Sequence, residues 1–233
     1  MKPSPGEPGG AGRIVPALGF AFLTPLYDSV MALLMREGTF RRVLLEQAAI
    51  APGHEVLDLG CGTGTLAAMI ATRNRDVGVT GLDADAEVLA IAKRKALALG
   101  ASIRFDLGLA TRLPYPDASF DRVVSSLLFH HLSPQDKSKA ASEARRVLRP
   151  GGEFHVVDWG RASNPLMAFL FLPVRILDGF ANTRDNVEGR LPAELREAGF
   201  ADARQVGAMG TTFGTLAFCR ATAPAGAPAA DSR

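Results

Sequence analysis

VLDLGCGTGTL, residues 56–66, is the stretch that decides the fold of this chain. It begins as a short buried strand and runs directly into Gly60, Gly62 and Gly64. Glycines after a strand let the backbone approach a ligand, and the N-terminus of the helix that follows offers free N–H groups. The stretch therefore predicts a strand, a ligand-binding loop and a helix in direct succession.

Two acidic residues accompany this loop. Asp83 ends the next predicted strand, where a carboxylate can accept both hydroxyls of an adenosine ribose. Asp58, inside the first strand, can orient the loop or bind a cationic group of a ligand. The dinucleotide fingerprint G-x-G-x-x-G needs glycine at position 65, which is Thr65 here, so phosphate binding is disfavoured. The glycine loop alone could be a turn that ends a strand, and Asp83 alone could be a cap on the surface. The loop and the acid together, in one β-α-β unit, predict a nucleoside site.

Strands and helices alternate on both sides of the loop. A helix capped by Ser133 and Pro134 is predicted to run to about Leu148 and to end at Gly151–Gly152, before the strand EFHVVDW. Strands separated by helices indicate a parallel sheet with right-handed crossovers. From residue 203, ARQVGAMGTTFGTLAFCRA predicts two strands joined by a tight turn, which adds an antiparallel edge to a mostly parallel α/β sheet.

The domain organisation is simple. Residues 1–12 and 223–233 are rich in proline, glycine and alanine, and we expect both tails to be disordered. Residues 13–222 are expected to form one domain, with N-terminal helices over 13–50 and an apolar, proline-interrupted insert over 161–185. An amphipathic helix is predicted from about residue 25 to 36 and a second helix from about 39 to 50.

Composition excludes several classes of protein. The 26 basic and 24 acidic residues leave a net charge of +2, and the basic residues are scattered, which argues against nucleic acid. The two cysteines lie far apart and no Cys/His ligand spacing occurs, so neither a disulfide nor a metal site is expected. We find no signal peptide and no membrane-spanning stretch, and therefore expect a cytoplasmic protein.

With these motifs in view, the chain resembles the class I S-adenosylmethionine-dependent methyltransferases. Within them it is similar to the branch of the ubiquinone/menaquinone C-methyltransferases (methyltransferase type 11). The resemblance covers residues 50–160 and rests on VLDLGCGTG, GLDAD, LPYPDASFDRVV, HHL and LRPGG. It implies a Rossmann-like, seven-stranded sheet of order 3-2-1-4-5-7-6 with helices on both faces and an N-terminal helical cap. The implied cofactor is S-adenosylmethionine, released as S-adenosylhomocysteine.

The same resemblance implies a cofactor site. By this likeness, Gly60, Cys61 and Gly62 line the methionine part of the cofactor, and Asp83, with its neighbour Ala84, holds the ribose. Related chains often place an aspartate at the adenine amino group, where this chain has Leu109, so we expect adenine to be recognised by shape and by the main chain of Ala110. The expected cofactor residues are Asp58, Gly60, Cys61, Gly62, Asp83, Ala84, Leu109 and Ala110.

Methyl transfer is a direct displacement, so the protein's main tasks are to align the acceptor and to exclude water. An acceptor that must lose a proton gains from a base, and His131, with His130 second, follows the fourth predicted strand on the ligand side of the sheet. A core histidine and a surface histidine explain the pair equally well. Tyr27 and Arg190 are weaker candidates for catalysis and for substrate contact, respectively.

The acceptor is expected to be small and lipophilic. LMAFLFLPV, residues 166–174, carries apolar groups on every side, so we expect it to be buried or to bind something apolar. We predict a lid in which Phe169 and Phe171 contact the acceptor. Core packing, a dimer interface or contact with a membrane surface are the alternatives, and the oligomeric state stays open. The alternative functions are a cofactor-binding partner subunit without catalysis and a nucleotide-dependent oxidoreductase.

Overall fold

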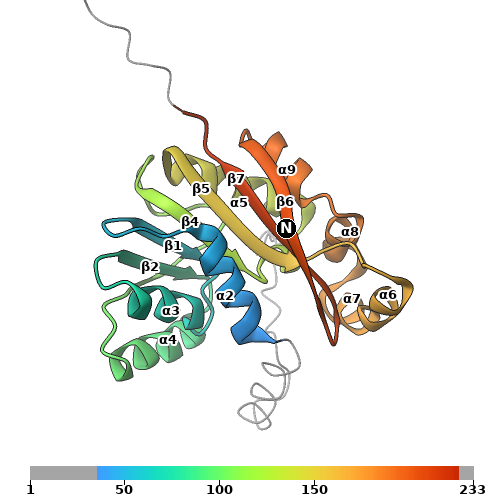
Figure 1. Ribbon diagram of the computed structural model, residues 1–233, viewed down its shortest axis with the longest axis horizontal. Helices are drawn as coiled ribbons and strands as arrows, with labels where there is room; N and C mark the ends of the chain where they lie inside the picture. Colours follow the sequence, from blue (N-terminus) through green and yellow to red (C-terminus); the bar gives the residue numbers. More distant parts are fainter. Residues whose placement is uncertain (1–35, 226–233) are drawn as a thin grey trace, which may run out of the picture.

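The computed structural model describes residues 36–225. The predicted tail 1–12, the helix predicted from residue 25, and Tyr27 lie outside the described residues, as do residues 226–233. Within the described range, one sheet of seven strands runs in the order β3-β2-β1-β4-β5-β7-β6, which confirms the predicted topology (Figure 1). In that same range, no helix is both long enough and apolar enough to cross a bilayer.

The strands are β1 (Glu55–Leu59), β2 (Gly78–Asp83), β3 (Arg104–Leu107), β4 (Phe120–Ser126), β5 (Leu148–Trp159), β6 (Ala201–Thr211) and β7 (Gly214–Thr222). The helices are α2 (Glu37–Ala48), α3 (Thr65–Arg73), α4 (Ala86–Ala98), the 3-10 turn η1 (Phe129–His131), α5 (Pro134–Val147), α6 (Pro165–Leu170), α7 (Leu172–Asp178), α8 (Phe180–Glu188) and α9 (Leu191–Glu197).

Alternating side chains along the central strands build two cores, one on each face of the sheet. Leu57 and Val123 face the core that α5 and α9 close, whereas Val56 and Val124 face the core that α2 and α3 close. In Figure 1, α2 and α3 lie in front of the sheet and α5 lies behind it. This layering brings the carboxyl ends of the parallel strands β1, β2, β4 and β5 to one end of the sheet.

As the predicted order requires, the antiparallel strand β7 pairs with both β5 and β6 and lies one place in from the edge. One detail of the C-terminal half differs from the sequence prediction. Helix α5 ends at Val147, and β5 begins at once with Leu148, so Gly151–Gly152 lies inside the strand and does not end the helix. The pairing of β4 with β5 shifts register before Arg122, and a glycine pair fits such an irregularity.

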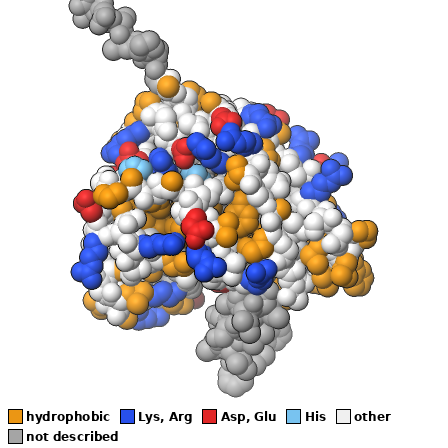
Figure 2. Space-filling model, in the orientation of Figure 1, with side chains coloured by type: hydrophobic (Ala, Val, Ile, Leu, Met, Phe, Trp, Pro, Cys, Tyr) orange, Lys and Arg blue, Asp and Glu red, His pale blue; other side chains and the backbone are white. Residues whose placement is uncertain are grey.

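The insert at 161–185 folds as α6, α7 and most of α8, and of the two predicted alternatives, burial or contact with something apolar, most of its apolar side chains are not buried. Leu166, Phe169, Ile176 and Leu177 are at least 60% exposed. Figure 2 shows these helices as a hydrophobic area at the lower right of the molecule. Within the described residues, the segment packs on the sheet through few side chains, chiefly that of Phe171. Most of its apolar surface therefore stays exposed.

Candidate active site

The glycine loop is fastened to the second strand by its own backbone. The N–H groups of Gly60 and Cys61 both donate to the Leu82 carbonyl, at 2.9 and 3.0 Å, and the Gly62 N–H donates to Asp83 Oδ2 at 2.8 Å. A phosphate group would need these donors free. The loop is therefore suited to a ligand without a pyrophosphate, as the sequence predicted from Thr65.

The three glycines of this loop have different structural roles. A Cβ on Gly60 would come within 2.9 Å of the Leu128 side chain, and a Cβ on Gly64 within 2.8 Å of Ala92, so both are needed for close packing. A Cβ on Gly62 would meet no heavy atom of the described chain within 4 Å, although its φ of 51° also favours glycine. The open side of the loop thus lies at Gly62, where a ligand can approach the backbone.

Asp58 lies beneath this loop and is fully buried. Its Oδ2 accepts the Ala67 N–H at 3.0 Å, so the carboxylate occupies the N-terminus of α3, where a phosphate would otherwise bind. Its Oδ1 finds no hydrogen-bond partner within the described part of the chain. Burial raises the pKa of Asp58 to about 7, although the Arg41 guanidinium and the Ala67 N–H oppose the rise.

Asp83 joins the glycine loop to the start of α4. One carboxylate oxygen accepts the Gly62 N–H, and the other accepts the Asp85 N–H at 3.0 Å. Each oxygen retains a second lone pair for a ribose hydroxyl. Ala84 follows it on the exposed surface of the turn. The contacts are compatible with the ribose role that the resemblance implies, and that role stays a prediction.

The sequence analysis missed two cations that lie beside the loop. Lys95 of α4 donates to Thr65 Oγ1 at 2.7 Å and to Thr63 Oγ1 at 3.2 Å, and burial followed by the nearby Arg41 charge lowers the pKa of Lys95. Arg41 lies on α2, with a side chain that is 16% exposed, and its Nε lacks a partner among the described residues. Both residues are far from the loop in sequence and their elements carry no motif, so only the folded chain reveals them.

Leu109 and Ala110 form the expected adenine side of the site. Gly108 donates to the Asp83 carbonyl at 2.9 Å, so this turn is anchored to the same strand end as the ribose acid. Leu109 is 54% exposed, and Ala110 packs partly against the core below. The side chain of Leu109 is thus free to cover a flat ring, and its contact with adenine remains a prediction.

The histidine pair lies at the carboxyl end of β4, and its buried member is the one held in place. His130 is 4% exposed and its Nδ1 lies 2.8 Å from Asp158 Oδ1. Asp158 is fully buried at the end of β5 and also accepts the N–H groups of Phe129 and Trp159. Burial alone would raise the pKa of Asp158, but the His130 charge and these hydrogen bonds outweigh burial and hold that pKa below its usual value.

The ring of His131 contacts that of His130 at a tilt of 41°, with ring centroids 3.9 Å apart, but the His131 side chain is 48% exposed. Its Nδ1 lies 3.3 Å from Asp178 Oδ1, at the end of α7. Burial lowers the pKa of His131, yet the hydrogen bond and the charge of Asp178 outweigh burial and raise the pKa above its usual value. Neither Asp158 nor Asp178 was singled out from the sequence, because each is an isolated acid far from the pair.

The three candidate substrate residues lie in different surroundings. Phe169 on α6 is 68% exposed, as a residue that contacts an acceptor or a partner would be. Phe171 is 5% exposed and packs against Trp159, with ring centroids 4.8 Å apart, so the prediction that it contacts the acceptor is replaced by a role in the core. Arg190 is exposed just before α9, where its N–H donates to the Asp185 carbonyl.

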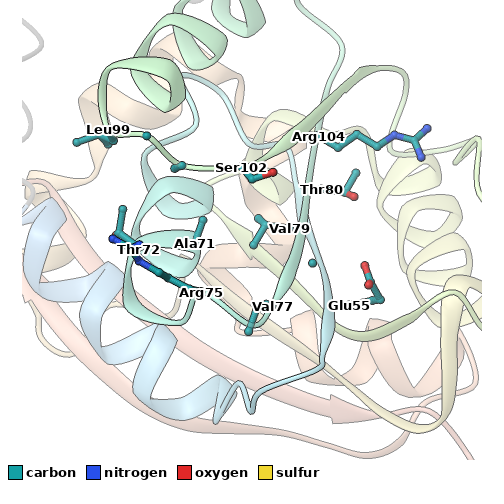
Figure 3. A pocket seen from close by; sticks show the side chains of 13 residues that line it. Glu55, Ala71, Thr72, Arg75, Val77, Val79, Thr80, Leu99, Ser102 and Arg104 are labelled. Atoms are coloured by element: carbon teal, nitrogen blue, oxygen red, sulfur yellow. The ribbon is translucent and has the colours of Figure 1, made fainter.

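A hollow of about 600 Å³ lies at the opposite end of the sheet (Figure 3). Its lining includes the starts of three strands, at Glu55, Gly78 and Arg104, and the C-terminal ends of α3 and α4. Parallel α/β sheets bind their ligands beyond the carboxyl ends of the strands. We therefore place the functional site at the glycine loop and not in this hollow.

Known proteins share this arrangement. The family described as a methyltransferase domain matches residues 56–152. A demethylmenaquinone methyltransferase of Deinococcus radiodurans is 35% identical over 173 residues, which are 73% of this chain and 70% of the relative. A demethylmenaquinone methyltransferase of Thermus thermophilus is 37% identical over 142 residues, which are 60% of this chain and 64% of the relative.

The fold is also similar to that of solved structures. A SAM dependent methyltransferase from Aquifex aeolicus matches with a TM-score of 0.63 and 20% sequence identity, over 85% of this chain and 95% of that chain. At this identity the likeness concerns the fold alone.

Proposed function

This chain belongs to the class I S-adenosylmethionine-dependent methyltransferases, and from that membership we propose that it methylates a small, lipophilic acceptor with a hydroxylated ring, of the quinol type. Its cofactor is S-adenosylmethionine, as the sequence predicted. The observation that carries the site assignment is the loop itself, because its N–H groups are used internally while the Gly62 side stays open.

The residues of the loop fit this cofactor. When bound, S-adenosylmethionine supplies a methyl group activated by the positive sulfonium. Asp58 offers to a cationic group a buried oxygen that has no partner among residues 36–225, and Asp83 offers lone pairs to ribose hydroxyls. We assign the methionine part to Gly60, Cys61 and Gly62 through their backbone, because the Cys61 side chain is buried beneath the loop.

The acceptor class is supported by two independent features. Two curated relatives are named for a quinone-type acceptor. On this chain, α6 and α7 expose an apolar surface next to the carboxyl end of β5, and the polar cluster of His130, His131 and Asp178 lies beside it. A ring that is apolar except for a hydroxyl group matches such a pairing. We assign the hydroxyl contact to this cluster, in place of the base role predicted for His131, with His130 second.

The two alternative functions lose support. A nucleotide-dependent oxidoreductase would need free loop donors for a pyrophosphate, and those donors are occupied. A partner subunit without catalysis is not favoured either, since the relatives that share most of this chain's length carry methyltransferase names.

An acceptor screen tests the proposal. Purified protein and S-adenosylmethionine are incubated with 1,4-naphthalenediol, a monohydric phenol, a primary amine or a fatty acid, and release of S-adenosylhomocysteine is measured. We expect the diol to exceed each of the other acceptors at least about tenfold, which corresponds to roughly 1.4 kcal/mol of selectivity. Equal or higher rates with the amine or the fatty acid would contradict the quinol-type assignment.

A further inference from the structure

We propose that His130, His131 and Asp178 form a binding site for a divalent transition-metal ion of the zinc type. The inference that this ion holds the hydroxyl oxygen of the acceptor rests on the proposed function, whereas the metal site itself does not. No such site was expected from the sequence, because the ligand that completes it comes from the end of α7, far along the chain from HHL.

The geometry of the donor atoms carries the proposal. His130 Nε2 lies 3.7 Å from Asp178 Oδ2, and His131 Nδ1 lies 3.3 Å from Asp178 Oδ1. One donor atom from each residue lies within 4.8 Å of the other two. With metal–ligand bonds of about 2.0–2.2 Å, tetrahedral ligands are separated by about 3.3–3.6 Å. The two measured separations, each to a different oxygen of Asp178, are close to this range.

The outer contacts of His130 are those of a metal ligand. Asp158 also accepts backbone N–H groups and a carboxylate only accepts, so the hydrogen of His130 must lie on Nδ1. Nε2 is then the ring nitrogen that faces Asp178, and it can bind a metal ion when it carries no proton. A histidine that gives one N–H to a carboxylate and turns its other nitrogen to a metal is the usual arrangement in metal sites.

Contacts with β5 and with the cofactor loop fix the position of this cluster. Asn186 of α8 donates to the Trp159 carbonyl at 3.0 Å, which fixes the helix after Asp178 against the end of β5. Leu128, two residues before His130, packs against Gly60 of the cofactor loop. The cluster therefore lies between the cofactor loop and the apolar surface of α6 and α7, where an acceptor would have to be held.

The chemistry of the donors selects the ion. Two imidazoles and one carboxylate suit zinc, iron, cobalt or nickel, whereas magnesium prefers oxygen ligands alone. Three protein ligands leave at least one position open. An acceptor hydroxyl bound there would ionise more readily, because a dication lowers the pKa of a hydroxyl that it binds.

Cobalt(II) is the probe that tests the site, because it absorbs visible light when bound to protein ligands and follows zinc in its geometry. The chain, free of any histidine tag and of S-adenosylmethionine, is titrated with cobalt(II) chloride, and zinc chloride is added afterwards. We expect one equivalent of cobalt to bind, to be displaced by zinc and to be left in place by a large excess of magnesium chloride.

Variants with matched controls locate the site. Changing an outer-shell partner of a metal ligand typically costs about 10–100-fold in metal affinity, so removal of a ligand by Asp178→Asn or His131→Asn should weaken cobalt binding at least tenfold. Asp202→Asn, at a 53% exposed carboxylate, and His54→Asn should bind cobalt like the original chain.

Absence of cobalt binding, or equal binding in Asp178→Asn, overturns the proposal and leaves the cluster as a hydrogen-bonded group. Because this titration involves neither acceptor nor cofactor, a failed acceptor screen does not affect its result. If cobalt binds but the diol is not methylated, the metal site stands and the proposed acceptor falls.

Discussion

Asp58 is the residue whose charge most affects the cofactor loop, because it is fully buried at the N-terminus of α3. Its carboxyl has an ordinary pKa of 3.8 and a pKa of about 7 in the fold. Between these values the folded chain holds one proton more than the unfolded chain, so this group lowers the stability as the pH rises from about 4 to 7. Above pH 7 its effect is constant.

We therefore predict that Asp58→Asn is less sensitive to pH than the original chain. Between pH 5 and pH 7.5, the Tm of the original chain should fall more than that of the variant, because Asn cannot titrate. Binding of a cation next to Oδ1 favours the ionised acid, so S-adenosylmethionine should release a proton near pH 6.5, and Asn should abolish this release. Calorimetry in two buffers of different ionisation enthalpy measures it. Identical pH profiles of Tm for the two proteins would contradict the raised pKa.

The residues that could be predicted were those with a local signal. Asp58 lies just before the glycine loop, Asp83 ends the next predicted strand, and the HHL sequence drew attention to His130. Asp158, Asp178, Arg41 and Lys95 carry no such signal, since an isolated charged residue is usually a solvated surface group. Their roles depend on burial and on contacts between segments far apart in sequence, and one sequence contains neither.

At the scale of elements, the α6–α7 segment combines an exposed aromatic side chain, that of Phe169 on α6, with a buried one, that of Phe171 between the two helices. We predict that Phe171→Ser lowers the free energy of unfolding by about 3–5 kcal/mol, since it empties the space against Trp159. Phe169→Ser, at a 68% exposed position, should change stability by less than about 0.5 kcal/mol and raise the KM for a lipophilic acceptor. Denaturant unfolding and steady-state kinetics measure the two effects. Equal stabilities would show that the ring of Phe171 is not part of the core.

The elements were predictable where periodicity and caps coincide, as at Ser133 and Pro134 of α5. The insert was harder, because a segment that is apolar on all sides predicts either burial or contact with something apolar, and the fact that α6 and α7 expose most of those groups is visible only in the fold. Likewise, Gly151–Gly152 resembles a helix end in sequence, but β5 extends through both glycines, whose backbone groups bond to Ala223 just after β7. Tertiary pairing overrides the local signal at such positions.

At the scale of the whole molecule, a buried lysine connects the helices behind the sheet with the candidate site. Lys137 of α5 is 1% exposed, and its Nζ donates to the Asn182 carbonyl at 2.6 Å and to Asn186 Oδ1 at 2.8 Å. Asn186 in turn donates to the Trp159 carbonyl, beside Asp158. The position of α8, and with it that of Asp178 before it, thus depends on a charge from another helix.

Lys137→Met therefore tests how far this connection supports the fold. The variant leaves the Asn182 carbonyl and Asn186 Oδ1 without their buried donor, and we expect it to lower the free energy of unfolding by about 1–3 kcal/mol. Lys139→Met, on the same helix but 61% exposed and paired with Asp136, should lower it by less than about 1 kcal/mol. Both proteins should bind S-adenosylhomocysteine like the original chain, because the cofactor loop lies between β1 and α3 and is hydrogen-bonded to β2. If denaturant unfolding gave both variants the same stability, Lys137 would not anchor α8, and the position of Asp178 would have to depend on other contacts.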